Sequence, residues 1–246
     1  MVLLLHGFGE NGNIWNLQFE QLKQNYFVVV PDLPGSGQSE ILEGARSMTD
    51  YADVVKAIVD EEIKKNGKTT FSLIGHSMGG YITLAFAEKY PELLTRFGLF
   101  HSSAFADDQQ KIDTRKKGIE FIKKNGGEAF LKTSIPNLFS EITKQQNPEL
   151  LDNLLNIAKD ISASALIQYY EAMILRPDRT GVLKSFPRPV LFISGTYDTA
   201  IPLQASLEQS HIPAISSLHI LQNSGHVGMW EEATLATSCL EKFLII

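Results

Sequence analysis

The sequence predicts an α/β protein in which a mostly parallel sheet is flanked by helices. Two observations carry this prediction. Short, β-rich apolar runs alternate with longer stretches of helical periodicity, and a glycine-rich turn joins one such run directly to a helix. This alternation is typical of a parallel sheet crossed by helices. The predicted strands are Val2–Leu5, Phe27–Val30, Thr69–Ile74, Phe97–Phe100, Val190–Ser194 and Leu218–Leu221.

The connections between the first strands read as amphipathic helices. Residues 14–22 place apolar side chains at helical spacing, and so do residues 51–65, where Asn66-Gly67 then ends the helix in a turn. Two of the strands, at 28–30 and 191–193, are continuous apolar runs, as expected of parallel strands that are buried on both faces.

The alternation is interrupted between Ser103 and Pro187. These roughly 80 residues show helical patterns and no strand pattern. A connection of this length is not a simple loop in a compact domain. We therefore expect an α/β core at residues 1–103 and 187–246, with a helical cap (lid) at residues 104–186 over one end of the sheet.

Composition excludes several classes of function. The chain has 246 residues, 22 Lys plus Arg, 28 Asp plus Glu and a net charge of −6, which offers no general attraction to nucleic acid or anionic lipid. No apolar run approaches the length of about 18 residues that a transmembrane helix needs, and the start lacks the features of a signal peptide. We expect a cytoplasmic protein with neither nucleic acid nor membrane as partner.

The side chains available for chemistry carry oxygen and nitrogen rather than sulfur. The single cysteine, Cys239, excludes an internal disulfide framework and a thiolate zinc cluster. No histidine or carboxylate cluster has metal-ligand spacing, and Gly35-Ser36-Gly37 lacks the remaining features of a phosphate-binding loop. The sequence predicts no metal and no organic cofactor.

The strongest motif is Gly75-His76-Ser77-Met78-Gly79, which lies between a strand pattern and a helix pattern. In this setting G-x-S-x-G forms a sharp turn that strains the serine and exposes its hydroxyl. Glycine occupies both flanking positions because side chains there would collide with neighbouring backbone. The turn lies at the carboxyl edge of the sheet, where α/β sheets place their ligands. Ser77 is therefore the predicted nucleophile.

With four further segments, this motif makes the chain similar to the α/β-hydrolase superfamily, in its serine-nucleophile, lidded carboxylesterase and C–C hydrolase-like branch. The resemblance implies a Ser-Asp-His triad in the chain order serine, acid, histidine, and an oxyanion hole of two backbone amides. The four segments cover nearly the whole chain and are His6-Gly7-Phe8-Gly9, residues 31–39, Gly195-Thr196-Tyr197-Asp198 and Ser224-Gly225-His226.

A serine hydroxyl needs a base to take its proton, and the chain has six histidines. His226 lies in a loop beyond the last strand, at the same sheet edge as Ser77, and is the predicted base. His101 ends the strand before the cap, and we expect it to line the site and contact substrate. We expect structural roles for the remaining histidines, which are His6, His76, His211 and His219. For His6 this role is what the resemblance implies.

Asp198 is the predicted acid, which orients the histidine and stabilises its protonated form. It follows the strand Val190–Ser194 and so lies on the loop beside that of His226. Asp32 is the alternative because it also ends a strand, but it precedes Ser77, and the resemblance implies a structural turn at its position. The superfamily's other position for the acid, directly after Phe97–Phe100, holds His101 and no carboxylate.

The resemblance implies that Met78 and Phe8 supply the two backbone N–H groups of the oxyanion hole. The Phe8 side chain either forms part of the acyl pocket or packs under the cap. Aromatic residues of the cap either line an apolar tunnel or form ordinary cap core, and of these we expect Tyr169 and Tyr170 to contact substrate. The full aromatic set is Phe121, Phe130, Phe139, Tyr169 and Tyr170.

These features lead to the hypothesis that the chain hydrolyses a small carboxylic ester or thioester through an acyl-enzyme on Ser77. Epoxide and halide chemistry is disfavoured because those relatives carry a carboxylate at the elbow. C–C bond hydrolysis, perhydrolysis and a lyase reaction use the same layout and stay as alternatives. A non-catalytic small-ligand receptor is the alternative of another class. A cap of this size favours a small-molecule acyl substrate over a polymer.

The start of the chain carries one further expectation. The resemblance implies a β-hairpin ahead of the strand that ends in His6-Gly7, whereas the printed chain begins inside that strand. Either the edge of the sheet is naturally trimmed, or the start was assigned a few dozen residues late. An exposed edge at Val2–Leu5 would make stability and solubility the first properties to test.

Overall fold

The computed structural model describes residues 1–44, 47–67 and 69–245. Its six strands form one sheet in the order β2-β1-β3-β4-β5-β6, and every neighbouring pair is parallel. The predicted α/β class is confirmed. The strands are β1 (Val2–Leu5), β2 (Val28–Val29), β3 (Phe71–His76), β4 (Leu94–Phe100), β5 (Val190–Gly195) and β6 (Ser216–Leu221).

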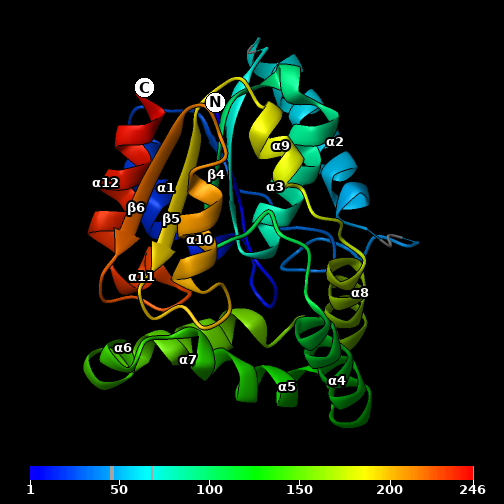
Figure 1. Ribbon diagram of the computed structural model, residues 1–246. Helices are drawn as coiled ribbons and strands as arrows, with labels where there is room; N and C mark the ends of the chain where they lie inside the picture. The colour runs from blue at the N-terminus through cyan, green and yellow to red at the C-terminus, as the bar shows by residue number, and fades with distance from the viewer. Residues whose placement is uncertain (45–46, 68, 246) are drawn as a thin grey trace.

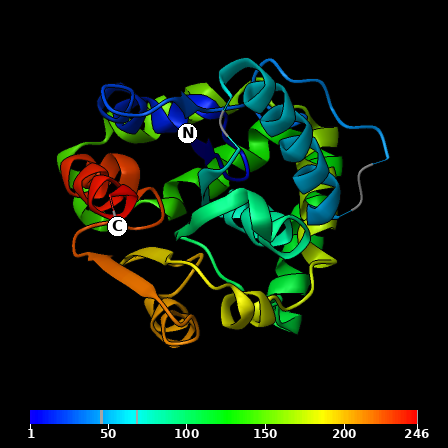
Figure 2. The same cartoon turned by 90° about the horizontal axis from the view of Figure 1, so that it is seen from above.

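Helices cover both faces of this sheet. Figures 1 and 2 show α1 and α12 on one face, with α2, α3 and α10 on the other. The core helices are α1 (Asn16–Leu22), α2 (Met48–Asn66), α3 (Met78–Lys89), α10 (Leu203–Ser210), α11 (Gly228–Glu231) and α12 (Ala233–Leu244). Short 3₁₀ turns lie at η1 (Gly12–Trp15) and η2 (Pro91–Leu93). The predicted end of the second helix is confirmed, since Gly67 caps α2 with φ 64°.

A layer of helices lies below the carboxyl ends of the strands (Figure 1). It contains α4 (Gln109–Asn125), α5 (Gly127–Ser134), η3 (Ile135–Leu138), α6 (Glu141–Gln146), α7 (Glu149–Ala158) and α8 (Ala163–Ile174). One further helix of the predicted cap range, α9 (Thr180–Ser185), instead packs against α3 in the core. We refer to the layer formed by α4–α8 as the cap layer.

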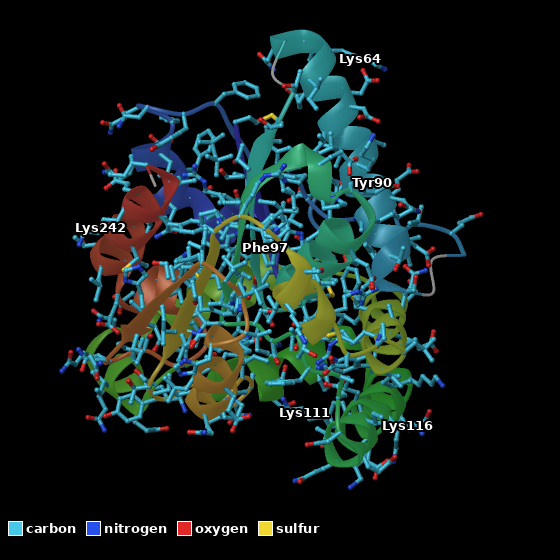
Figure 3. All side chains as sticks on the ribbon, turned by 45° about the horizontal axis from the view of Figure 1, so that its top comes forward. Lys64, Tyr90, Phe97, Lys111, Lys116 and Lys242 are labelled. Atoms are coloured by element: carbon cyan, nitrogen blue, oxygen red, sulfur yellow. The ribbon has the colours of Figure 1, made fainter. Side chains whose placement is uncertain are left out.

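The hydrophobic core lies between the sheet and its two helix layers. Phe97 and Phe192 are fully buried, whereas Lys64, Lys116 and Lys242 lie at the periphery (Figure 3). Every residue of β1, β3 and β5 is buried, as expected of central parallel strands.

Two predictions about the sheet edge were wrong. Val2–Leu5 is not an edge, because β1 pairs with β2 on one side and with β3 on the other, and its residues are at most 1% exposed. Val28–Val30 is not buried on both faces, because β2 has only β1 as a neighbour and is half-buried. Hydrophobic patterning identified both strands, but their order in the sheet depends on contacts far apart in sequence.

Candidate active site

Ser77 lies on the turn between β3 and α3 and is strained there, with φ 50° and ψ −115°. The predicted need for flanking glycines is confirmed. A Cβ on Gly75 would lie 2.2 Å from the Gly79 carbonyl oxygen, and one on Gly79 would lie 2.6 Å from that of His6. This close packing holds the half-buried Ser77 side chain at the carboxyl edge of the sheet.

His226 lies in the loop after β6 and connects two of the predicted site residues. Its Nε2 is 2.8 Å from Ser77 Oγ, and its Nδ1 is 2.8 Å from Asp198 Oδ2. The His226 backbone N–H donates to the Leu138 carbonyl in the cap layer at 2.6 Å. The structure therefore brings Ser77, His226 and Asp198 into one hydrogen-bonded chain, with the cap layer bonded to the histidine loop.

Asp198 is buried, and its second carboxylate oxygen is also satisfied. Oδ1 accepts the backbone N–H groups of Ala200 at 2.9 Å and Ile201 at 2.8 Å. Burial alone would raise the pKa of Asp198, but the charge of His226 and the hydrogen bonds of two histidines hold it well below its usual range. Burial lowers the pKa of His226, but the charge of Asp198 outweighs it and leaves this pKa above its ordinary value.

The alternative acid, Asp32, has a different set of partners. Its Oδ1 accepts the N–H of Gly12 at 2.8 Å, and its Oδ2 accepts that of Gln38 at 2.9 Å. A Cβ on Gly37 would overlap the Asp32 carboxylate. Asp32 thus ties together the two loops that follow β1 and β2.

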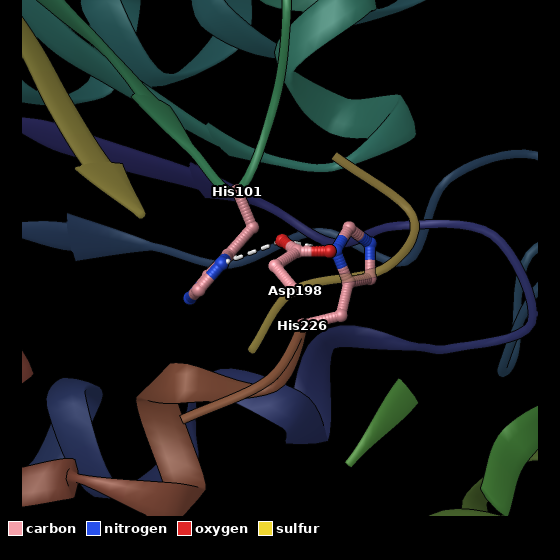
Figure 4. A group of neighbouring side chains, drawn as sticks. All are labelled: His101, Asp198 and His226. Atoms are coloured by element: carbon pink, nitrogen blue, oxygen red, sulfur yellow. Dashed lines mark hydrogen bonds and ion pairs between the residues drawn. The ribbon is translucent and has the colours of Figure 1, made fainter. Parts of the chain in front are cut away.

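His101 does not line the cavity beside Ser77, contrary to the prediction that it contacts substrate. It is fully buried, with φ 48°, and its Nδ1 lies 2.9 Å from Asp198 Oδ2, the oxygen that also binds His226 (Figure 4). The Gly195 N–H also points at this nitrogen, at 3.2 Å. The shorter contact, to a charged carboxylate, favours a proton on Nδ1, so two histidines donate to one oxygen.

His76 and Glu10 form a second buried pair that the sequence analysis missed. Glu10 accepts from the Gly7 N–H at 2.7 Å and from His76 Nδ1 at 2.9 Å. Burial would raise the pKa of Glu10, but the charge of His76 holds it below its ordinary value. His76 Nε2 lies 2.9 Å from the His226 carbonyl oxygen. The pair formed by Glu10 and His76 joins the loop after β1 to the histidine loop.

The two predicted oxyanion-hole residues flank Ser77. Met78 is the first residue of α3, and Phe8 lies in the loop after β1. This loop packs directly on the serine, since a Cβ on Gly7 would lie 3.1 Å from Ser77 Cβ. Met78 therefore directly follows the serine in the chain, and the loop that carries Phe8 packs against the serine; a role of their N–H groups as oxyanion donors stays a prediction.

The cavity beside Ser77 is small, with a volume of about 130 Å³. Tyr170 lines it, as predicted. Phe8 lines it too and also packs under the cap layer, since its ring stacks on that of Tyr170 with centroids 4.3 Å apart. Tyr169 does not line it, contrary to the prediction. Its ring is fully buried, and its hydroxyl donates to the Pro34 carbonyl at 2.6 Å, so it holds the cap layer on the loop after β2. Helical periodicity places both tyrosines on α8 but does not say which one faces the cavity.

One group in the described part of the chain has atoms close enough to hold a metal ion. These atoms belong to His101, Asp198 and His226 and lie within 4.8 Å of one another. The same atoms already form the hydrogen bonds described above. The arrangement therefore fits proton transfer from Ser77 to His226, with the Asp198 carboxylate hydrogen-bonded to the histidine.

Comparison with known proteins agrees with this architecture. The profile of the α/β-hydrolase fold matches residues 1–233. The chain belongs to the α/β-hydrolase family, and it is an enzyme of that family. No helix in the described residues is long and apolar enough to cross a membrane.

Individual relatives cover almost the whole chain. The 2-hydroxy-6-oxononadienedioate/2-hydroxy-6-oxononatrienedioate hydrolase of Escherichia coli strain K12 is 27% identical, over 99% of this chain and 86% of its own length. A thermophilic esterase of Thermogutta terrifontis has a TM-score of 0.92 and 27% identity, over 99% of this chain and 88% of its own. The enol-lactonase of Burkholderia xenovorans LB400, at 20% identity and a TM-score of 0.89, shares the fold over 100% of this chain and 91% of its own.

Proposed function

We propose that this enzyme hydrolyses a small carboxylic ester or thioester through an acyl-enzyme on Ser77. The observation that carries the proposal is the continuous hydrogen-bonded chain from Ser77 Oγ through His226 to Asp198, with 2.8 Å at each link. Ser77 and His226 both line the small cavity, so a substrate carbonyl has access to the hydroxyl. The 27% identity to a thermophilic esterase supports the same chemistry.

Each residue then has one role in the reaction. His226 takes the proton of Ser77 Oγ as this oxygen attacks the carbonyl carbon, and Asp198 stabilises the imidazolium that forms. The backbone N–H groups of Phe8 and Met78 donate to the oxyanion. His226 then protonates the leaving alcohol or thiol. Water, activated by His226, attacks the acyl carbonyl and releases the acid.

The substrate that we propose is a small molecule, and we propose neither nucleic acid nor a membrane as partner. A cavity of about 130 Å³ is smaller than the ~300 Å³ at which drug-sized ligand pockets begin. It fits a short acyl group rather than a polymer. The net charge of −6 also disfavours binding to anionic polymers and anionic membrane surfaces. We propose a cytoplasmic location.

C–C bond hydrolysis is the second candidate. It is favoured by the 27% identity to the dienedioate hydrolase of E. coli across 99% of this chain. Perhydrolase and lyase reactions use the same set of residues. A panel of p-nitrophenyl esters of increasing acyl length, acyl thioesters, vinylogous diketones and peroxide-dependent halogenation separates these reactions by product.

Labelling with a fluorophosphonate probe tests the proposal directly. We expect one covalent adduct, located by mass spectrometry on Ser77, because only a serine activated by a base attacks phosphorus at a useful rate. Prior heat denaturation should abolish the label. A folded protein that takes up no probe would contradict the proposal and favour a small-ligand receptor.

The pH dependence of hydrolysis follows from the raised pKa of His226. The base must be neutral to accept the serine proton, so kcat/KM should fall as the pH drops through a midpoint above 6.5. His101→Phe removes a competing donor from Asp198 Oδ2, which leaves more negative charge for His226 and should raise this midpoint. A His101 that only fills space would leave the midpoint unchanged. The measurement is kcat/KM for one ester across the acid and neutral range.

A further inference from the structure

The cavity beside Ser77 contains an arginine from the cap layer. Arg115, on α4, lines this cavity together with Ser77 and His226, and its side chain is 17% exposed. Among the described residues that line the cavity it is the one Lys or Arg. The lining carboxylate, Glu10, is already bound by the Gly7 N–H at 2.7 Å and by His76 Nδ1 at 2.9 Å. A fixed positive charge at the wall of a small, mostly apolar cavity is unusual unless an anion binds there.

Arg115 is held in place from one side and leaves the other side free. Its Nε donates to Asp107 Oδ2 at 2.6 Å, and its Nη2 lies 3.4 Å from Asp107 Oδ1. The guanidinium also lies over the Tyr170 ring, 5.5 Å from its centroid. A guanidinium has five donors in a planar fork. With two of them engaged by Asp107, further N–H groups are available to a ligand.

Asp107 does not neutralise this arginine, because a second arginine shares it. Arg176 Nη1 lies 2.8 Å from Asp107 Oδ1, and both the Asp107 and Arg176 side chains are buried. Arg176 is anchored independently by the Phe105 and Met173 carbonyls and by the face of the Tyr81 ring, 3.8 Å from its centroid. The three charged groups therefore carry a net charge of +1, and Arg115 is the one that faces the cavity.

The remaining cavity wall is mostly apolar, with Leu131, Ile135, Leu138, Met173 and Ile201 among its residues. An apolar wall with one oriented guanidinium distinguishes a carboxylate from a methyl group of similar size. We propose that the acyl part of the substrate carries a carboxylate, which binds Arg115 while the scissile carbonyl lies at Ser77. This inference rests on the proposed function of ester hydrolysis. The substrate class is the half-ester or thioester of a short dicarboxylic acid.

Two methyl esters that differ in one group test this inference. Monomethyl succinate and methyl butyrate have acyl parts of similar shape, and the first ends in a carboxylate where the second ends in a methyl group. We expect the enzyme to prefer monomethyl succinate in kcat/KM, measured by pH-stat titration. Arg115→Gln should reduce this preference about 10- to 100-fold, the effect of losing one charge-assisted interaction. Arg115→Lys, which keeps the charge but not the fork, should fall between the two.

Lys116→Gln is the matched control, because Lys116 is the next residue on α4 but is exposed and is not among the residues that line the cavity. It should leave the preference unchanged. Asp107 keeps Arg176 as its partner in the Arg115 variants, which favours normal folding. Turnover of methyl butyrate without a preference for the succinate ester, or a preference that survives Arg115→Gln, would overturn this inference alone. Failure to hydrolyse either methyl ester while p-nitrophenyl esters are turned over would also overturn this inference alone. Failure with every ester and thioester of the panel would overturn the proposed function and this inference with it.

Discussion

Replacement of Ser77 with alanine should lower kcat for p-nitrophenyl ester hydrolysis by about 10⁴- to 10⁶-fold. The variant removes the oxygen that we propose attacks the carbonyl, while the proposed backbone donors of Phe8 and Met78 and the cavity stay in place. Residual turnover above the uncatalysed rate is therefore expected. KM should change far less than kcat, because the hydroxyl contributes little to ground-state binding. The fluorophosphonate label should disappear as well.

Ser217→Ala is the control for this variant. Ser217 lies on β6, where its hydroxyl contacts His219 at 3.1 Å and has no contact with the site. The same chemical change there should leave kcat unaltered. Urea unfolding of both variants shows whether either loses stability. Full ester turnover by a folded Ser77→Ala protein would rule out the acyl-enzyme mechanism.

Replacement of Asp198 with asparagine should lower kcat by about 10⁴-fold. The N–H groups of Ala200 and Ile201 donate to Oδ1, so the asparagine places its carbonyl toward them and its NH₂ group toward His226. His226 Nδ1 must then accept rather than donate, which moves its proton to Nε2. A histidine in this tautomer cannot take the proton of Ser77. Steady-state kinetics at a pH above the acid limb measure the loss.

Asp32→Asn is the matched control because Asp32 was the alternative acid. Its carboxylate binds the N–H groups of Gly12 and Gln38 in loops away from His226, so its loss should lower stability more than kcat. Thermal unfolding and kcat for the two variants separate these effects. A 10⁴-fold loss in kcat on Asp32→Asn, with little change on Asp198→Asn, would show that Asp32 and not Asp198 is the acid.

The sequence identified those parts of the protein that depend on local chemistry. The strands follow from short apolar runs, and the turn at Ser77 follows from glycines whose Cβ atoms would meet backbone at 2.2 to 2.6 Å. The end of α2 follows from Gly67, which adopts a left-handed conformation there. Because these constraints act within a few residues, a single amino-acid sequence is enough to predict the strands, the turn and the helix end.

The residues of the candidate triad could also be predicted from the sequence, because of the topology of a parallel sheet. The carboxyl ends of parallel strands meet at one edge of a sheet, so chemistry-bearing residues directly after β3, β5 and β6 gather there. This argument places Ser77, Asp198 and His226 at one edge. It does not say which atoms meet. The distances of 2.8 Å at both links of His226 come from the packing of three loops.

The tertiary structure alone decided which side chains face one another across elements distant in sequence. It placed His101 on Asp198 rather than on substrate, and it buried Tyr169 while Tyr170 lines the cavity. It also paired Glu10 with His76, 66 residues apart. The position of β1 between β2 and β3 was likewise decided by contacts between segments distant in sequence. Each of these contacts joins segments that are far apart in sequence, and neither segment's sequence indicates its partner. A buried polar or charged group needs a hydrogen-bond partner, and a buried ring needs close packing, but only the fold decides which residue is near enough to supply it.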